Sequence, residues 1–530
     1  MNKIAKYLNQ HLTGNVFDRE EILHKYATDR SILRIMPQMV VVPESTNDVR
    51  RVVRFVNQLA IKGVKLGLYT RGSGLDATGA DLGKDIVLST EKLNKIQEID
   101  EHARLVRVQA GCTLGQLNSA LSLLGLTIPI KADPRETIGG LISNFKSDDY
   151  GGKYNGIYYF VDCIETVVST GDIVQTGRYS KRAIDRKRGL TSFEGSIYRD
   201  LSGLIETQFD LVSDIRRRRT IDSAGYQMVT QVFREKGRTF DLMPIFYAAQ
   251  GTLGIITEVI LRCEVLPSHK KRFAVAFSDA NELTKFAQTA QGFDPLEMNL
   301  YDARIFSAAA ETGKDPAIFN KKFENGYVLL LSFDNNARKN KKKIAKLIKS
   351  LPETAAAVVE TAENESDFAR IDTAIKSYLN DDVHGERMPL VDDFYVSAQK
   401  LPEFLVSLRE QEEAYDMALP ISGSIATGNY SLRPELVMNT VAGRQFVVKF
   451  LREFDSLLSV YEGSLTGGSA EGRVKAIVTN QNLSDAEFEL YSRIKKIFDP
   501  NDIFAPDIKL GTEIKAVVKA LRTSSLDDIA

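Results

Sequence analysis

The sequence predicts an α+β protein in which a first domain that contains a β-α-β unit precedes a second domain built on an antiparallel sheet. Three observations support this prediction. The chain has 530 residues, too many for a single hydrophobic core. A β-α-β unit near the N-terminus leads into a glycine-rich turn, and beyond residue 267 strand-like and helix-like segments alternate as in an α+β domain.

The composition is that of an ordinary globular protein, with 43% apolar and 26% charged residues. The formal net charge of −1 gives no electrostatic reason to expect nucleic-acid binding. No apolar run approaches the roughly 18 residues of a membrane-spanning helix, and the N-terminus lacks the apolar core of a signal peptide. We therefore expect a cytoplasmic protein without a transmembrane segment, for which peripheral membrane contact is not excluded.

The three cysteines, Cys112, Cys163 and Cys263, are far apart and have no metal-ligand spacing. Each lies in an apolar, strand-like run, so we expect free thiols and no disulfide framework.

The first ordered unit follows an N-terminal extension, residues 1–36, for which we expect short helices. A strand at 39–42 precedes a helix that can be capped by Ser45 and that ends at Gly63. A second strand follows at 66–69, and only then does the glycine-rich turn begin. In a Rossmann unit the glycine turn follows the first strand, so this pattern argues against that fold.

The glycine-rich turn reads Arg71-Gly72-Ser73-Gly74-Leu75-Asp76-Ala77-Thr78-Gly79-Ala80. Glycine allows positive φ and a close approach of backbone to a ligand, and successive N–H groups make an anion-binding concavity. Arg71 and the hydroxyls of Ser73 and Thr78 add further donors. The turn therefore suits a pyrophosphate.

Two later glycine segments have the same character. Thr137-Ile138-Gly139-Gly140 follows a proline-framed turn, and Gly251-Thr252-Leu253-Gly254 enters a strand that runs to Cys263. Before the first of them we expect a strand at 105–111 and a helix at 114–124. Between the two segments, we interpret residues 178–196 as a basic loop and residues 216–219 as a solvated charged face.

The second domain begins near residue 267. We expect strands at 272–278, 296–300, 326–333, 355–361, 391–396 and 417–423. We expect helices at 280–292, 337–351, 365–379 and 400–415, with two further helices at 440–458 and 484–498. The second of these ends in the turn Phe498-Asp499-Pro500.

The three glycine segments and this closing turn, in this order and spacing, resemble the FAD-linked oxidases of the vanillyl-alcohol-oxidase (PCMH-type) fold. Within that fold the chain is similar to the D-lactate dehydrogenase and glycolate-oxidase-subunit group, from about residue 17 to 511. The resemblance implies a two-part FAD-binding domain at 37–267 and a cap domain at 268–480. It also implies a C-terminal helical segment at 481–521 that returns to the FAD domain, before a disordered tail at 522–530.

The resemblance further implies a set of FAD-binding residues. They are Arg71, Gly72, Ser73, Gly74, Leu75, Asp76, Thr78, Gly79, Pro134, Thr137, Gly139, Gly140, Ser143, Gly254 and Ile256. Ser73 occupies the position at which some relatives attach flavin through histidine, so FAD should be non-covalent. Asp76 departs from the family pattern, because a carboxylate suits a pyrophosphate site only if it points away or caps a backbone N–H.

The cap departs further from the family pattern. Two metal-binding histidines of the 2-hydroxyacid dehydrogenases correspond to Ser424 and Ser431, the carboxylate ligand to Gly468 and the substrate-side histidine to Ser469. The surrounding frame is kept at Gly423, Gly428, Asn429, Gly467, Gly472 and Lys475. We therefore expect no metal of the family type.

The replacement residues that we consider for the chemistry are Asn429, Tyr430, Glu471 and His384, with Arg370 or Arg387 as carboxylate anchors. Tyr430 would need a lowered pKa to act as an acid or base. His384 lies in an acidic stretch with Asp381, Asp382 and Glu386, which we interpret as a solvated loop or, alternatively, as a different metal cluster.

Three functions are compatible with the sequence. The first is FAD-dependent oxidation of a 2-hydroxy acid such as D-lactate by hydride transfer to flavin. The second is metal-independent oxidation of another alcohol or a sugar on the same fold. The third is a catalytically decayed flavin-binding protein. The sequence does not name the electron acceptor or the oligomeric state.

Overall fold

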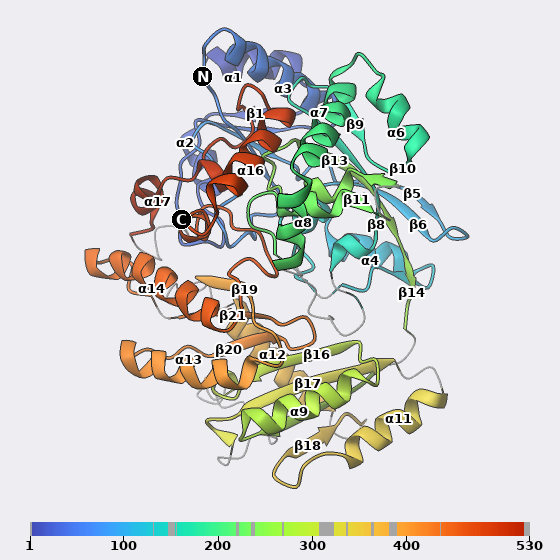
Figure 1. The fold of residues 1–530 in the computed structure, drawn as a ribbon, viewed down its shortest axis with the longest axis vertical. Helices are drawn as coiled ribbons and strands as arrows, with labels where there is room; N and C mark the ends of the chain where they lie inside the picture. The colour runs from blue at the N-terminus through green and yellow to red at the C-terminus, as the bar shows by residue number, and fades with distance from the viewer. Residues whose placement is uncertain are drawn as a thin grey trace.

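The computed structural model describes residues 3–130, 132–146, 154, 156–218, 222–234, 239–267, 270–306, 323–334, 338–361, 365–380, 389–434 and 436–523. It has an upper body that holds both ends of the chain and a lower body built around one large sheet (Figure 1). Among the described residues, no helix combines the length and apolar character needed to cross a membrane.

The first sheet of the upper body carries the glycine-rich turn. Its strand order is β1 (Asn15–Phe17), β2 (Met39–Val42), β4 (Ile86–Ser89) and β3 (Leu68–Arg71). Strands β2, β4 and β3 are parallel, so the helix α3 (Thr46–Ile61) makes the crossover between β2 and β3. Ser45 caps α3 by accepting a hydrogen bond from the Asp48 N–H, as expected. The turn thus starts where β3 ends.

Strand β1 was not predicted. Residues 1–36 were predicted to contain short helices, and they do form α1 (Lys3–His11) and α2 (Glu20–Leu23). They also contribute β1, which pairs with β2. Three residues are too short a run to show strand periodicity in the sequence.

The second sheet of the upper body is antiparallel, and the other two glycine segments adjoin it. Its strand order is β5 (Ile96–Asp100), β6 (Leu105–Gln109), β13 (Ile255–Arg262), β8 (Val161–Val167) and β9 (Ile173–Gln175). Helix α4 (Leu114–Ser122), which falls in the predicted segment 114–124, has Thr113 as its N-cap. Helix α5 (Ile138–Ser143) begins after Thr137, whose hydroxyl accepts a hydrogen bond from the Gly140 N–H.

Helices cover this sheet from one side, where the predicted basic loop proves to be ordered. Residues 178–196 form β10 (Arg178–Ser180), α6 (Lys181–Arg188) and the start of α7 (Phe193–Thr207). The prediction of a loop was wrong because α6 buries only Ile184, so its sequence shows no apolar stripe. Helix α8 (Phe209–Arg218) follows, with β11 (Phe233–Arg234), β12 (Thr239–Asp241) and, at the domain edge, β7 (Leu126–Thr127) paired with β14 (Glu264–Val265).

The lower body is an antiparallel seven-stranded sheet. Its order is β18 (Ala356–Val359), β15 (Lys270–Phe277), β17 (Tyr327–Asp334), β16 (Glu297–Asp302), β20 (Ile421–Ser424), β21 (Asn429–Leu432) and β19 (Val391–Tyr395). Six of these strands match the predicted segments. The seventh, β21, was not predicted, because its four residues follow a turn directly.

The two faces of this sheet have different partners. One face packs into an apolar core with α9 (Ala280–Gln291), α11 (Arg338–Lys349), α13 (Leu401–Tyr415) and α14 (Val441–Val460). Helix α12 (Glu365–Asn380) covers only part of the other face, around Val328 and Leu330. The uncovered part carries polar side chains toward the upper body.

The chain ends against the upper body. Helix α16 (Asp485–Phe498) packs its apolar face, which includes Ile494 and Phe498, into the larger core of that body. Beyond it, Phe504 bridges to Leu68 at the start of β3. The short helix α15 (Ala476–Thr479) and the last helix, α17 (Ile514–Ala520), complete the α-helices of the described residues.

Candidate active site

A cavity of about 950 Å³ lies where the three glycine segments meet. Most of the predicted cofactor residues line it: Gly72, Ser73, Leu75, Asp76, Thr78, Thr137, Gly139, Gly140, Ser143, Gly254 and Ile256. Their convergence follows from topology, because the end of β3, the start of α5 and the start of β13 all meet at this point. We call this space the flavin cavity.

The other four predicted residues lie next to the cavity and do not line it. The Arg71 guanidinium stacks on the Tyr26 ring at 5.5 Å and packs beneath Gly74, whose φ of 75° no larger residue adopts easily. Gly79 packs against Leu33. Pro134 lines a larger neighbouring cleft.

The Asp76 carboxylate accepts hydrogen bonds from groups within and next to the glycine-rich turn. It accepts hydrogen bonds from the N–H groups of Thr78 and Ala80, at 3.0 and 2.9 Å. The Thr78 hydroxyl and the Asn144 amide also donate to it. The aspartate therefore caps backbone N–H groups, which is one of the two arrangements compatible with a nearby pyrophosphate.

The lining of the cavity suits a dinucleotide in chemistry. Its walls combine glycine backbone with apolar side chains such as Leu75 and Ile256. The Thr70 hydroxyl, which lines it, is a buried polar atom without a partner in the protein. A ligand oxygen in the cavity would satisfy it.

Gln250 is a cavity residue that the sequence did not single out. Its side-chain nitrogen donates to Thr78 Oγ1 and Asn144 Oδ1, both at 2.9 Å, and its oxygen accepts from the Gly472 N–H at 2.9 Å. Gln250 thus ties the glycine turn to the cap-derived loop at 466–475. The sequence feature that could have identified Gln250 as a site residue is its position immediately before the Gly251 turn.

A larger cleft of about 2350 Å³ adjoins the flavin cavity. The two spaces share Arg30, Glu136, Lys146, Asp392 and Asp393. On the cap side, the cleft is lined by alternate residues of adjacent strands: Glu297, Asn299, Tyr301, Ser422, Asn429 and Ser431. The uncovered polar face of the cap sheet therefore forms one wall of this cleft.

Charged side chains and one residue with a left-handed backbone conformation lie at the junction between the two spaces. Lys146 pairs with Glu136 at 2.7 Å. Burial lowers the pKa of Lys146, but the carboxylates of Glu136 and Asp393 outweigh it and raise the pKa, so the ammonium stays charged. Asp393 adopts a left-handed φ of 59°, a conformation that costs free energy and is frequent at functional sites.

Four residues of the cleft wall carry buried polar atoms without a partner in the protein. They are the Oδ1 atoms of Asn299, Asp392 and Asn429 and the Nε of Arg433. Asn299, Asn429 and Arg433 are each at least nine-tenths buried. Unsatisfied buried groups in one cavity wall are unfavourable unless a ligand completes them.

Tyr430 does not belong to this wall. Asn429 and Tyr430 are consecutive in β21, so their side chains point to opposite faces of the sheet. Tyr430 is fully buried in the apolar core beside Phe394, and burial raises the pKa of its hydroxyl. The prediction that it acts as an acid or base was wrong, because both its position and its pKa shift oppose that role.

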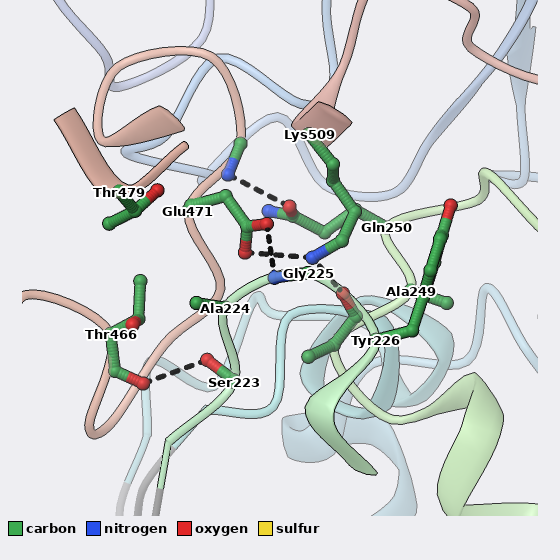
Figure 2. Close-up of polar contacts among 12 residues, drawn as sticks. Ser223, Ala224, Gly225, Tyr226, Ala249, Gln250, Thr466, Glu471, Thr479 and Lys509 are labelled. Carbon is green, nitrogen blue, oxygen red and sulfur yellow. Dashed lines mark hydrogen bonds and ion pairs between the residues drawn. The ribbon is translucent and has the colours of Figure 1, made fainter. Parts of the chain in front are cut away.

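Glu471 is also not free for chemistry. It is fully buried and forms an ion pair of 2.7 Å with Lys509, which is equally buried (Figure 2). Its other oxygen accepts a hydrogen bond from the Gly225 N–H at 2.8 Å. Figure 2 shows the pair enclosed by Gly225, Tyr226, Ala249 and Gln250. The structure therefore corrects the prediction of a catalytic Glu471: it fastens the 466–475 loop to the upper body.

The remaining candidates lie elsewhere. Arg370 projects from α12 with about half of its side chain exposed, beside Asp367, and it lines neither space. His384 and Arg387 lie outside the described residues, as do Asp381, Asp382 and Glu386. Within the part of the chain that is described, no three His, Cys, Asp or Glu side chains converge as a metal site would require.

Two protein-family models match this chain. Residues 37–177 match the model of an FAD binding domain, and residues 266–508 match that of the C-terminal domain of FAD linked oxidases. The match places the glycine-rich turn and α5 in the first domain, and the cap sheet and the 466–475 loop in the second.

Curated relatives are similar over most of this chain. A D-2-hydroxyglutarate dehydrogenase of Pseudomonas putida is 25% identical over 91% of the chain and 49% of its own length. The glycolate oxidase subunit GlcD of Bacillus subtilis is 22% identical over 92% of both proteins, and a D-lactate dehydrogenase of Anaerostipes hadrus is 22% identical over 92% of the chain and 93% of its own length. The chain thus spans about half the length of the first of these relatives.

Solved structures share the fold. A 4-ethylphenol oxidase from Gulosibacter chungangensis superposes with a TM-score of 0.68 at 14% identity, covering 96% of both chains. p-Cresol methylhydroxylase gives 0.66 at 15% identity over 97% of both chains.

Proposed function

Since this chain belongs to the FAD-linked oxidases of the PCMH-type fold, with FAD as cofactor, we propose that it oxidises a 2-hydroxy acid at its CH–OH carbon. The observation that carries the proposal is the junction of the two spaces. A glycine-lined cavity that fits the cofactor opens into a polar cleft, and the same five residues line both.

FAD, when bound, supplies the acceptor for the hydride. The residues that would hold it are those of the flavin cavity, with the turn at 72–78 beside the pyrophosphate and the segments around Gly139 and Ile256 beside the rings. Ser73 stands where a covalent histidine would be needed, so we propose that FAD is held non-covalently.

The cleft wall supports a substrate that combines a carboxylate with a hydroxyl. Arg433 offers an unpartnered Nε–H donor, which suits a carboxylate oxygen. The unpartnered Oδ1 atoms of Asn299 and Asn429 suit a hydroxyl donor. Together these side chains would orient the substrate at the junction with the flavin cavity, without a metal of the family type.

A second candidate function is favoured by the same wall. Three of its four unpartnered atoms are acceptors, which suits a substrate rich in hydroxyl groups, such as a sugar or polyol. We therefore retain metal-independent oxidation of another alcohol as the alternative to a simple 2-hydroxy acid.

The test begins with the absorption spectrum of the purified protein and of its supernatant after heat denaturation. Released FAD supports non-covalent binding, whereas a protein that neither contains nor takes up FAD contradicts the proposal.

The holoprotein is then mixed anaerobically with D-lactate, D-2-hydroxyglutarate, glycolate, sugar acids and polyols, with and without a chelator. Bleaching of the flavin by a 2-hydroxy acid supports the first function, and bleaching by polyols alone supports the second. If a chelator abolishes the bleaching and a divalent metal restores it, the proposal that the site works without a metal is refuted.

If no compound bleaches the flavin, the protein behaves as a flavin-binding protein and the proposed oxidation is wrong. Where one does, oxygen, a quinone analogue and a cytochrome are compared as reoxidants of the reduced flavin, which identifies the class of electron acceptor.

A further inference from the structure

The loop at 466–475 brings a second buried lysine to the junction of the two spaces. The Lys475 ammonium nitrogen lies 2.7 Å from the Ser469 hydroxyl and 2.6 Å from the backbone carbonyl of Asp392. Ser469 lines the flavin cavity, and Asp392 lines both the cavity and the cleft. Lys475 therefore lies directly behind the place where cofactor and substrate would meet.

Lys475 differs from other buried cations in its partners. It is almost completely buried, yet among the described residues no carboxylate oxygen lies within ion-pair distance of its nitrogen. A charged ammonium has three N–H donors, whereas Lys475 has two hydrogen-bond partners, both neutral oxygens. As drawn, the Lys475 nitrogen donates to both oxygens. Because burying an unpaired charge is unfavourable, a neutral amine suits this place better, and it would still donate to the Asp392 carbonyl while accepting the Ser469 O–H.

The electrostatics favour the same state. Burial lowers the pKa of Lys475, and this effect exceeds the opposing influence of the surrounding carboxylates, Asp393, Asp392, Asp76 and Glu471. Two of these carboxylates face other cations, since Asp393 lies near Lys146 and Asp392 lies 3.4 Å from Arg433. No described histidine lines either space.

We propose that Ser469 and Lys475 together accept the hydroxyl proton of the substrate, an inference that rests on the proposed function. The substrate O–H bond breaks and its proton passes to Ser469 Oγ, while the Ser469 proton passes to the neutral amine of Lys475. FAD, when bound, would accept the C–H hydrogen with its electron pair, so that the carbon would become a carbonyl and Lys475 would become an ammonium. Ser469 makes the contact with substrate, and Lys475 acts through it.

The kinetic test uses the substrate that bleaches the flavin fastest. Ser469→Ala and Lys475→Met should each lower the rate of flavin reduction on the order of 10²–10⁴-fold, the usual contribution of general acid–base catalysis. The double variant should be no slower than the slower single variant, because both residues serve one proton transfer. FAD content and the oxidised flavin spectrum should be unchanged, which separates a chemical defect from loss of the site.

The pH dependence supplies a readout that a structural role would not move. In the wild type the reduction rate should rise with pH as Lys475 loses its proton, and this limb should disappear in Lys475→Met. Lysine side chains labelled with ¹³C at Cε report the titration directly by NMR in the holoprotein, with Lys475→Met identifying the resonance. We expect a midpoint below the ordinary lysine value of 10.5.

Each outcome decides the inference. A Lys475 resonance that titrates at or above the ordinary value overturns it, as does a Ser469→Ala enzyme with unchanged rate and pH profile. A wild-type flavin that no compound reduces overturns the proposed function and the proton-transfer role together. Normal reduction with an unaffected Ser469→Ala enzyme overturns only the inference.

Discussion

Two buried lysines in the same part of the molecule are held in opposite ways. Lys509 faces the Glu471 carboxylate at 2.7 Å (Figure 2), and both side chains are fully buried. Lys475 comes from the same loop as Glu471, but its nitrogen faces a serine hydroxyl and a backbone carbonyl. Burial lowers the pKa of both lysines, so the difference between them lies in their partners: Lys509 faces a carboxylate, and Lys475 faces only neutral hydrogen-bonding oxygens.

The difference indicates what each contact does. A compensated ion pair deep in the protein stays fixed, and here it fastens the 466–475 loop between the Gly225 N–H and the Ala248 carbonyl. Gly472 continues this attachment: its φ is 53°, and a Cβ there would collide with Thr78. An uncompensated amine at a cavity wall can change its protonation state, which is what a proton-transfer residue requires.

The largest expected effect comes from breaking the compensated pair. Lys509→Met leaves the Glu471 carboxylate buried beside a single N–H donor, which should cost about 3–5 kcal/mol of unfolding free energy. Urea unfolding of the holoprotein measures the loss. The double variant Glu471→Gln/Lys509→Met leaves no buried charge and should recover much of that stability. A single variant as stable as the wild type would show that the pair does not hold the loop.

Asp29, a buried acid beside the glycine turn, should make the stability of the folded protein depend on pH. Asp29 is buried, one of its oxygens has no partner, and burial together with the nearby Asp76 raises its pKa to about 7. The folded protein therefore keeps a proton that the unfolded chain releases near pH 4. Stability should be greatest below about pH 4 for this group and should fall as pH rises to about 7.

The melting temperature of the apoprotein between pH 5 and 8 checks this sign. The fall should be shallower in Asp29→Asn, which carries no titrating group at this position. Asp81, whose pKa is raised to about 8 by burial and by Asp76, should leave a residual slope. A melting temperature that rises steadily over the same range in the wild type, and equally in Asp29→Asn, would contradict the assignment.

The uncompensated lysine should contribute less to stability than the paired one. Lys475→Met removes the amine and leaves the Asp392 carbonyl and Ser469 hydroxyl without this partner, at a cost of about 1–2 kcal/mol. Urea unfolding, compared directly with Lys509→Met, measures the difference. A loss as large as that of Lys509→Met would indicate that Lys475 compensates a buried carboxylate, as Lys509 does.

The sequence predicted the flavin cavity better than the cleft, and there is a physical reason. The glycine turns and the strand that follows Gly254 are local signals, and the topology then brings them together. The role of Glu471 depends on Lys509, 38 residues away, and on a backbone N–H at Gly225, 246 residues away. No local pattern encodes such partners, so a buried ion pair was interpreted as a free carboxylate.

The adjacent candidates Asn429 and Tyr430 show a different limit. Had β21 been recognised as a strand, alternation alone would have excluded one of them. The same alternation explains why Asn299 and Asn429 share the cleft wall, since both pair with Ser424 across β20. Recognising a four-residue strand after a turn needs its neighbours in space.

The smallest expected effect concerns an uncharged group without a partner. The Tyr430 hydroxyl is fully buried and has no hydrogen bond. Tyr430→Phe removes this hydroxyl and keeps the ring, so the free energy of unfolding should stay unchanged or rise slightly, within about 0.5–1 kcal/mol.

The neighbouring variant Asn429→Ala should instead raise KM for the bleaching substrate about tenfold, because it removes an acceptor from the cleft wall at no cost to the core. Steady-state kinetics and urea unfolding of both variants test the pair. A large fall in kcat for Tyr430→Phe would return that side chain to the chemistry, and an unchanged KM for Asn429→Ala would remove the cleft wall from substrate binding.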